Sequence, residues 1–446
     1  MKNCGQLVSS KRRELGQPTH YELFCPTCHL RMADDGYILS CREQHSPTLL
    51  RTQYNAQDLR ISAGESGIYR YWDWLPIRHK LHGCGRTITY RSSGLSKLTG
   101  IRELWVAFNG YWPEKNANLT TGTFKELEAY CVLSRIPTGR GKILVIPSAG
   151  NTAAAFARAC SENNISSLIL VPESALEHMT FDVPISQCVT LVALSGESDY
   201  SDTIRVAEEL QYLDGFVLEG GAKNVGRRDG LGTVMLSAIE SIGTIPDFYF
   251  QAIGSGTGAI AVYEAAQRFS TERSNLPQLI LSQNLPFVPI VNAWNSSLAV
   301  WNALPVDQAK AQISQIQAKV LANRFPPYAV RGGLYDVLKA SRGFVLAVSN
   351  GEANVAAKLF EDCEGIDIGP ASAVAFASLL AAKSSGLIPV GKTVLLNITD
   401  GGKRRRATEL TLVRRIPDIV INAELQMPQL CAKTAARAVL AKAAAE

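Results

Sequence analysis

The stretch FYFQAIGSGTGAIAVYEAAQRF, residues 248–269, is the part of the sequence most informative about the fold. It joins an apolar run, a glycine-rich loop and a run of small and apolar residues with helical spacing. Continuous apolar strands are typical of parallel sheets whose two faces are both covered by helices. Glycines let the backbone approach a ligand, and the N-terminus of the following helix offers free N–H groups to an anion. The unit therefore predicts a phosphate-binding corner at the end of a parallel strand, although a plain tight turn would show a similar pattern.

The same alternation continues on both sides of this unit. Further strands are predicted at residues 142–147, 167–171, 189–194, 215–219, 279–282 and 394–398, and further helices at 152–163, 201–211 and 231–242. Alternating strands and helices predict an α/β fold with mostly parallel, doubly wound sheets. Such sheets bind ligands beyond the carboxyl ends of their strands.

Three other short motifs also stand at corners between predicted elements. SAGNT contains Asn151, which would either cap a helix or hold a ligand oxygen with its amide. TTGTFKELEAY contains Lys125 near a helix start, where a cation opposes the helix dipole. A lysine amine forms a Schiff base with an aldehyde cofactor, and an exposed lysine is the plain alternative. NITDGG contains Thr399, which either meets a buried ligand atom or belongs to a turn.

The N-terminal region carries a different kind of candidate site. CPTC supplies Cys25 and Cys28, and Cys41 and His45 follow in a CxxxH spacing. Two thiolates on a tight turn with a later Cys and His suit a tetrahedral zinc ion. The alternative is a ribbon that keeps its fold without metal, and zinc is slightly favoured.

The composition limits the classes of protein to which this chain can belong. With 446 residues, 46% hydrophobic residues and a net charge of +5, the chain has an ordinary globular composition and room for more than one domain. A small net charge without a long basic patch argues against nucleic-acid binding. The apolar run 371–382 is too short to cross a membrane, and the first residues lack the apolar core of a signal peptide. With ten cysteines, a cytoplasmic location with reduced thiols is expected.

Taken together and in order, the motifs resemble the fold-type II pyridoxal-phosphate enzymes, the tryptophan synthase β-like group. The resemblance covers roughly residues 65–430. Within the group the chain is most similar to the threonine synthase and cysteate synthase family. The stretches AFNGYWPE, FKELEAY, EGGAKNVGRRDG and QNLPFVPIVNAW are similar to cysteate synthases in particular.

The resemblance implies a role for each motif. Lys125 is implied to be the catalytic lysine that carries the cofactor, Asn151 to contact its 3-hydroxyl group, and Thr399 to meet its pyridine nitrogen. The phosphate is implied to lie on the loop formed by Gly254, Ser255, Gly256, Thr257 and Gly258.

The implied fold has two doubly wound parallel-sheet domains and a small N-terminal segment like a zinc ribbon. The expected domains are a Cys-rich segment (1–60), a large cofactor-binding domain (61–126 and 240–446) and a smaller α/β domain (127–239).

The implied reaction is a pyridoxal-phosphate-dependent β-replacement on O-phosphoserine. Elimination of phosphate gives an aminoacrylate, and addition of sulfite gives L-cysteate, so the enzyme is a lyase or transferase of amino-acid biosynthesis, expected as a homodimer. Arg227 and Arg228, which precede the predicted helix at 231–242, are the candidate receivers of the substrate anion, ahead of Lys223 and the basic run 403–406. The alternatives are a threonine synthase acting on O-phosphohomoserine, a β-replacement enzyme with another nucleophile and, from a different class, a zinc-ribbon nucleic-acid-binding protein.

Overall fold

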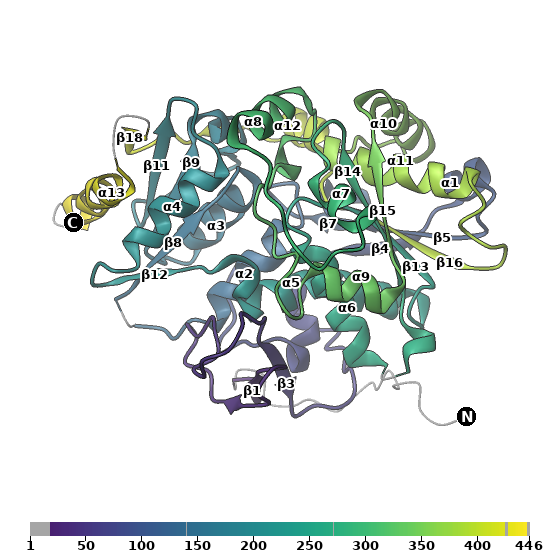
Figure 1. The fold of residues 1–446 in the computed structure, drawn as a ribbon, viewed down its shortest axis with the longest axis horizontal. Helices are drawn as coiled ribbons and strands as arrows, with labels where there is room; N and C mark the ends of the chain where they lie inside the picture. The colour runs from purple at the N-terminus through teal and green to yellow at the C-terminus, as the bar shows by residue number, and fades with distance from the viewer. Residues whose placement is uncertain (1–17, 140, 271, 424–426, 444–446) are drawn as a thin grey trace.

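Two parallel sheets lie side by side, with a small ribbon beneath them, in the computed structural model of the chain (Figure 1). The structure describes residues 18–139, 141–270, 272–423 and 427–443, so the N-terminal stretch of the signal-peptide prediction lies outside the described residues. Within those ranges, no helix combines the length and the apolar character needed to cross a bilayer.

The larger sheet has six strands, parallel except for one edge strand. Their order is β15 (Phe344–Val348), β14 (Gln278–Asn284), β13 (Phe248–Ala252), β16 (Thr393–Ile398), β5 (Glu103–Phe108) and the antiparallel β4 (Ile88–Arg91). On one face pack α10 (Asn350–Glu364) and α11 (Pro370–Ser384) with α1 (Ser93–Thr99); on the other lie α5 (Val225–Ile242), α6 (Thr257–Phe269), α9 (Leu334–Ser341) and α2 (Lys125–Arg135).

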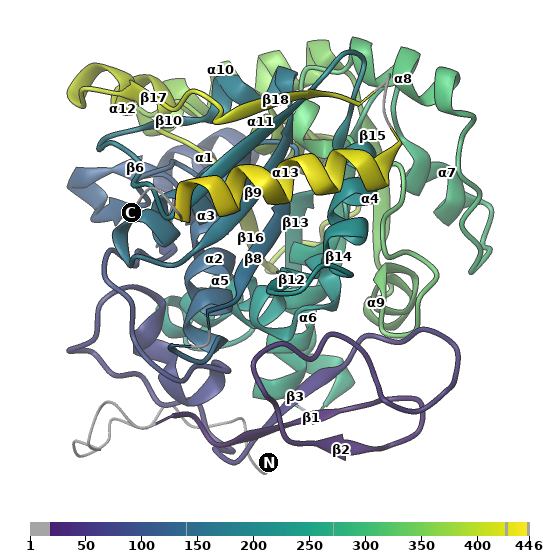
Figure 2. The ribbon, with the colours of Figure 1, turned by 90° about the vertical axis from the view of Figure 1, so that its left-hand side faces the viewer.

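The smaller sheet has five parallel strands. Their order is β12 (Phe216–Leu218), β8 (Ile143–Pro147), β9 (Ser167–Pro172), β11 (Val189–Ser195) and β18 (Ile419–Asn422). Helix α3 (Asn151–Glu162) covers its inner face, whereas α4 (Tyr200–Leu210) and α13 (Pro428–Ala443) cover the outer one. Figure 2 shows α13, in yellow, lying across these strands.

The domain boundaries stay a prediction. At the C-terminus, however, the strands pair in a way that does not follow the predicted boundary. The expected boundary assigned residues 240–446 to the large domain, whereas β18 pairs with β11 and α13 packs on α4. The apolar side of α13, which includes Cys431 and Ala435, closes the core of the smaller sheet. A terminal helix of modest hydrophobicity carries no local signal of which sheet it covers.

The N-terminal ribbon is an antiparallel sheet of β2 (Arg31–Met32), β1 (Tyr21–Phe24) and β3 (Arg51–Tyr54). It is attached to the helices beneath the site by buried polar contacts. The Asp34 carboxylate accepts two hydrogen bonds of 2.7 Å from Arg135 of α2, and Thr52 and Tyr54 each donate one of 2.6 Å to Asp229 of α5. The ribbon therefore rests on the two helices that carry Lys125 and Arg227.

Helix α5 begins six residues earlier than predicted, so the expectation that Arg227 and Arg228 precede a helix was wrong. The Asn224 side chain accepts from the backbone N–H of Gly226 and caps the helix there. Glycines in the first turns weakened the helical pattern, yet they allow close packing on α2: a Cβ at Gly230 would lie 2.4 Å from the Leu127 carbonyl oxygen.

The remaining elements are short. They are α7 (Pro289–Asn295), α8 (Val306–Gln315), α12 (Lys403–Glu409), β6 (Tyr111–Trp112), β7 (Ala117–Asn118), β10 (Thr180–Phe181) and β17 (Val413–Arg414).

Candidate active site

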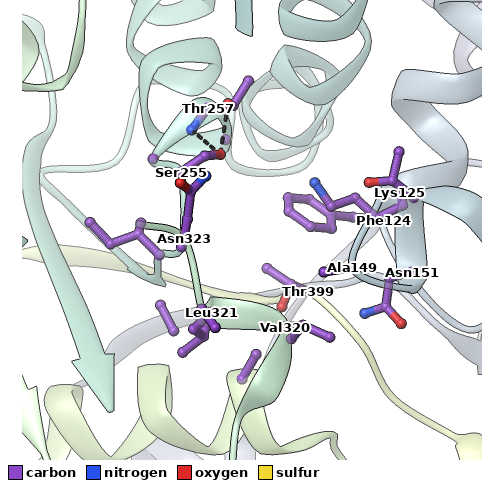
Figure 3. A pocket seen from close by; sticks show the side chains of 18 of the residues that line it. Phe124, Lys125, Ala149, Asn151, Ser255, Thr257, Val320, Leu321, Asn323 and Thr399 are labelled. Atoms are coloured by element: carbon purple, nitrogen blue, oxygen red, sulfur yellow. Dashed lines mark hydrogen bonds between the residues drawn. The ribbon is translucent and has the colours of Figure 1, made fainter. Parts of the chain in front are cut away.

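A pocket lies between the two sheets, where the carboxyl ends of β8, β13 and β16 meet the start of α2. Figure 3 shows Lys125 and Asn151 on one side of it and Ser255 and Thr257 on the other, with Thr399 between them. All eight residues expected to be catalytic or to bind the cofactor line this pocket: Lys125, Asn151, Gly254, Ser255, Gly256, Thr257, Gly258 and Thr399. Motifs spread over 275 positions of sequence are brought together because parallel strands end at one edge.

The loop before Lys125 is tied to the end of β16. The Phe124 N–H donates to the Thr399 carbonyl oxygen at 2.9 Å, and Thr123 forms an antiparallel bridge with Asp400. Lys125 is the first residue of α2, so its side chain leaves the helix at the end that faces the pocket. These contacts keep Lys125 and Thr399 close to each other at the pocket.

The amine of Lys125 lies in a charged and partly buried environment. Its Nζ atom is 3.3 Å from Glu128 Oε2. Burial lowers the pKa of Lys125; the Glu128 charge opposes that shift, and the Arg227 charge adds to it. A lowered pKa increases the fraction of uncharged amine, which is the nucleophilic form.

The glycine-rich loop takes the shape expected of an anion-binding corner. Gly256 has φ of +76° and precedes α6, and a Cβ there would lie 2.7 Å from the Leu334 side chain. Ser255 Oγ lies 2.8 Å from Thr257 Oγ1. The Thr257 N–H donates to Ser255 Oγ at 3.3 Å. The next N–H groups in the first turn of α6 precede the first carbonyl partners of the helix, so they can serve a phosphate at the pocket.

Asn151 does not cap its helix. The hydroxyl of Ser148 accepts from the backbone N–H groups of Gly150 and Ala153, at 3.0 and 2.9 Å, and so satisfies the start of α3. Asn151 is the first residue of α3 and lines the pocket. The capping alternative is therefore wrong, and the Asn151 amide can serve a ligand.

The two arginines of the predicted anion site face different surroundings. Arg227 lines the pocket, where its Nε donates to Glu219 at 2.8 Å and its Nη1 to Glu128 at 2.8 Å. Arg228 is directed away from the pocket, toward Glu264 and the carbonyl oxygens of Ala222 and Leu50. These contacts indicate that Arg228 holds the ribbon on α5 and α6 and leave Arg227 as the candidate anion receiver.

Three of the four residues in the basic run 403–406 are ion-paired. Lys403 pairs with Asp400, Arg404 with Glu361 and Arg405 with Glu114 and Glu409. Arg406 is buried and donates to the Thr180 carbonyl oxygen. All four have partners outside the pocket, so the run is not a candidate anion receiver.

Several residues at the site were not singled out from the sequence. They are the lining residues Tyr200, Gln251 and 320–323, and Glu128, which contacts the lysine from outside the lining. Glu128 lies one helical turn after Lys125, and the i, i+3 spacing was the signal that would have found it.

The four candidate zinc ligands converge in the ribbon. The ligand atoms of Cys25, Cys28, Cys41 and His45 all lie within 4.8 Å of one another. His45 Nδ1 is 2.8 Å from the Ser46 carbonyl oxygen, which leaves Nε2 facing Cys25 Sγ at 3.3 Å. Burial opposes ionisation of Cys25, but backbone N–H groups of Cys28 and Thr27 bring its pKa down to about 7. The Cys25 sulfur, two more cysteine sulfurs and an oriented imidazole suit tetrahedral zinc.

We expect the ribbon to bind about one zinc ion per chain. Cys41→Ser should lower the zinc content and the thermal stability of the ribbon, because metal binding contributes directly to the folding of small sites. Metal analysis and thermal unfolding of the purified protein measure both. Cys363→Ser, in α10 and outside the cluster, is the matched control. Full stability of metal-free protein would instead support a ribbon that needs no zinc.

Comparison with known proteins identifies the class. Residues 81–400 match the family model described as pyridoxal-phosphate dependent enzyme. Among solved structures, serine racemase from Dictyostelium discoideum superposes with a TM-score of 0.52 at 19% identity, covering 71% of this chain and 92% of that one. Diaminopropionate ammonia lyase from Escherichia coli gives 0.55 at 15%, covering 74% and 88%. The chain belongs to the pyridoxal-phosphate dependent enzymes, which confirms the predicted fold class and cofactor.

Closer relatives define the family within that class. The chain is 47% identical to the cysteate synthase of Methanosphaerula palustris, over 88% of this chain and 92% of the relative. It is 40% identical to that of Methanospirillum hungatei JF-1, over 93% and 98%. The chain therefore belongs to the cysteate synthase family, and the predicted family is confirmed.

The residues present fit the cofactor. Pyridoxal phosphate has an aldehyde, a phosphate and a polar aromatic ring, and the pocket offers the partly buried Lys125 amine, a helix N-terminus and the Asn151 and Thr399 side chains. Because Ser148 accepts from the backbone N–H groups at the start of α3, the Asn151 amide is not needed for capping, and this observation favours the match with the cofactor. The assignment of each residue to a part of the cofactor stays a prediction.

Proposed function

We propose that this chain converts O-phosphoserine and sulfite into cysteate and phosphate. The C–O bond at Cβ breaks, a C–S bond forms in its place, and inorganic phosphate leaves. The observation that carries the proposal is the joint placement of the Lys125 amine, the α6 N-terminus and the Arg227 guanidinium around one pocket. Identity to cysteate synthases over most of the chain supports the same conclusion.

Each group has a task in this proposal. Bound pyridoxal phosphate supplies an electron sink for the charge that develops at Cα. Lys125 holds the cofactor at rest and, once its amine is free, takes the proton from Cα as a general base. Thr399 offers an uncharged hydroxyl, which leaves the pyridine nitrogen without an acidic partner and favours elimination over transamination. The first turn of α6 holds the cofactor phosphate.

Arg227 is proposed to receive the anionic groups of the reaction. Three of its N–H donors are used by Glu128 and Glu219, and a guanidinium has five. The remaining two can meet the substrate phosphate and, after it leaves, sulfite. A planar guanidinium suits both oxyanions.

The proposal also includes a homodimeric assembly and a cytoplasmic location. The nine described cysteines are all free thiols, as is usual for proteins of a reducing compartment.

The proposal predicts a clear ranking of substrates. With O-phosphoserine, the enzyme should release phosphate and, when sulfite is present, form cysteate. O-Phosphohomoserine should react on the order of 100-fold more slowly, because its phosphate lies one methylene further from Cα and misses receivers placed for the shorter substrate. Phosphate release with and without sulfite, and mass spectrometry of the amino-acid product, measure the two rates.

The same assay distinguishes the alternatives. A threonine synthase would prefer O-phosphohomoserine and release threonine with water alone. A β-replacement enzyme with another nucleophile would release phosphate from O-phosphoserine but form no cysteate.

A further inference from the structure

Glu128 is a fully buried carboxylate one helical turn after Lys125. Its two oxygens are used differently. Oε1 accepts from Thr152 Oγ1 at 2.9 Å and from Arg227 Nη1 at 2.8 Å, whereas Oε2 accepts from Lys125 Nζ at 3.3 Å. One oxygen is thus anchored by other elements, and the second is presented to the lysine.

The anchors leave Glu128 little freedom to rotate. Thr152 belongs to α3 and Arg227 to α5, so the carboxylate is held from two helices besides its own. Arg227 is in turn held by Glu219, through Nε at 2.8 Å and through a second contact from Nη2. A carboxylate fixed before the reaction stabilises a nearby positive charge without having to reorganise.

Neutralising Arg227 does not account for Glu128. Glu219 already pairs with that guanidinium through both of its oxygens, which accept from Nε and Nη2. The cluster contains two cations, Lys125 and Arg227, and two carboxylates, Glu128 and Glu219, so its charges balance only while Lys125 carries its proton. Glu128 is therefore the counter-charge of the lysine.

We propose that Glu128 is a positioning residue for Lys125, which holds the ammonium form of that lysine beside the pocket whenever the amine is not bound to the cofactor. When Lys125 takes the proton from Cα, the C–H bond breaks, an N–H bond forms, and the new ammonium lies against the Glu128 carboxylate. The inference rests on the proposed function for the origin of this proton, but the lysine contact itself does not depend on the substrate.

Besides burial, three charged groups act most strongly on the pKa of Lys125: Glu128 on its own helix, Arg227 on α5 and Glu219 after β12. The Tyr200 phenol of α4 lies beside them. Removing the Glu128 charge should lower the pKa of Lys125, because an opposite charge within reach favours the charged form.

The test is the titration of Lys125 in the cofactor-free full-length protein. Competitive acetylation across pH, read by peptide mass spectrometry, gives the midpoint for this lysine, and exposed Lys358 in the same digest is an internal reference. Glu128→Gln should lower the midpoint by about 1 pH unit or more. Glu219→Gln removes the same charge from Arg227 without touching Lys125, so its shift should be smaller. In the enzyme with bound cofactor, the midpoint in the pH–rate profile that reports the ionisation of Lys125 should shift in the same direction.

An unchanged midpoint in folded Glu128→Gln would overturn the proposal, as would an equal shift in Glu219→Gln. If Glu128→Gln fails to fold, Glu128→Asp provides the test. This variant keeps the negative charge but moves it away from Lys125 Nζ. A lower midpoint for Lys125 then supports the proposal, and an unchanged midpoint overturns it. A wild-type protein that makes no cysteate, while the midpoint still moves in Glu128→Gln, would refute the proposed function and leave the role of Glu128 intact.

Discussion

Lys125→Ala is expected to abolish covalent cofactor binding and to reduce phosphate release from O-phosphoserine by about 1,000-fold or more. The variant loses both the amine that anchors the cofactor and the general base at Cα, and positioned bases alone contribute about 100- to 10,000-fold. The fold should survive, because Glu128 keeps its contacts with Thr152 and Arg227. Absorbance of the purified protein and borohydride reduction followed by mass spectrometry measure the loss of covalent cofactor, and the phosphate assay measures the loss of activity.

Lys358→Ala is the matched control for this experiment. Lys358 lies on α10 with its side chain 80% exposed and pairs with Asp362, away from the pocket, so the cofactor and the activity should be unaffected. A reducible covalent cofactor that persists in Lys125→Ala would show that another lysine carries it.

The position of the pocket could be predicted because its parts are local. Each corner consists of a strand, a short loop and a helix start, and the apolar runs of β8, β13 and β16 are clear in the sequence. Parallel sheets then bring such corners to one edge. This is why Lys125, Asn151 and Thr399 could be predicted to act together although they are far apart in the chain.

The contacts within the site could not be predicted in the same way. Whether Asn151 caps its helix depends on where the Ser148 hydroxyl points, and both roles suit the residue type. Arg227 and Arg228 are neighbours in sequence, but successive helical residues point about 100° apart, so one reaches the pocket and the other the ribbon. Which of two adjacent arginines meets a ligand is decided by the packing of α5 on α2.

The organisation of the C-terminus depends on contacts that are distant in sequence. Strand β18 joins the smaller sheet beside β11, more than 220 residues earlier in the chain. Residues 320–323, which line the pocket, have no pattern of their own and lie against the glycine loop: the Leu321 carbonyl oxygen would lie 3.0 Å from a Cβ at Gly254. Such close approaches are visible only once the chain has folded.

Arg227→Ala is expected to destabilise the protein by about 3–5 kcal/mol, the usual cost of leaving buried charges without their partner. Glu128 and Glu219 are both almost completely buried, and Arg227 joins them. Urea unfolding of cofactor-free protein measures the free energy of unfolding. Arg404→Ala is the control, because its exposed pair with Glu361 should contribute roughly 0–1 kcal/mol.

A second substitution tests whether unpaired charge is the cause. Glu219→Gln in the Arg227→Ala background removes one of the two buried carboxylates that lost their partner, so the double variant should recover part of the lost stability. The stability changes caused by substituting neighbouring residues that share an interaction do not add up, and a double-mutant cycle measures this coupling free energy. If Arg227→Ala unfolds with the free energy of the wild type, water reaches both carboxylates in its absence. Arg227 would then be a mobile cation rather than a fixed part of the cluster, and its role would be limited to the anions that enter the pocket.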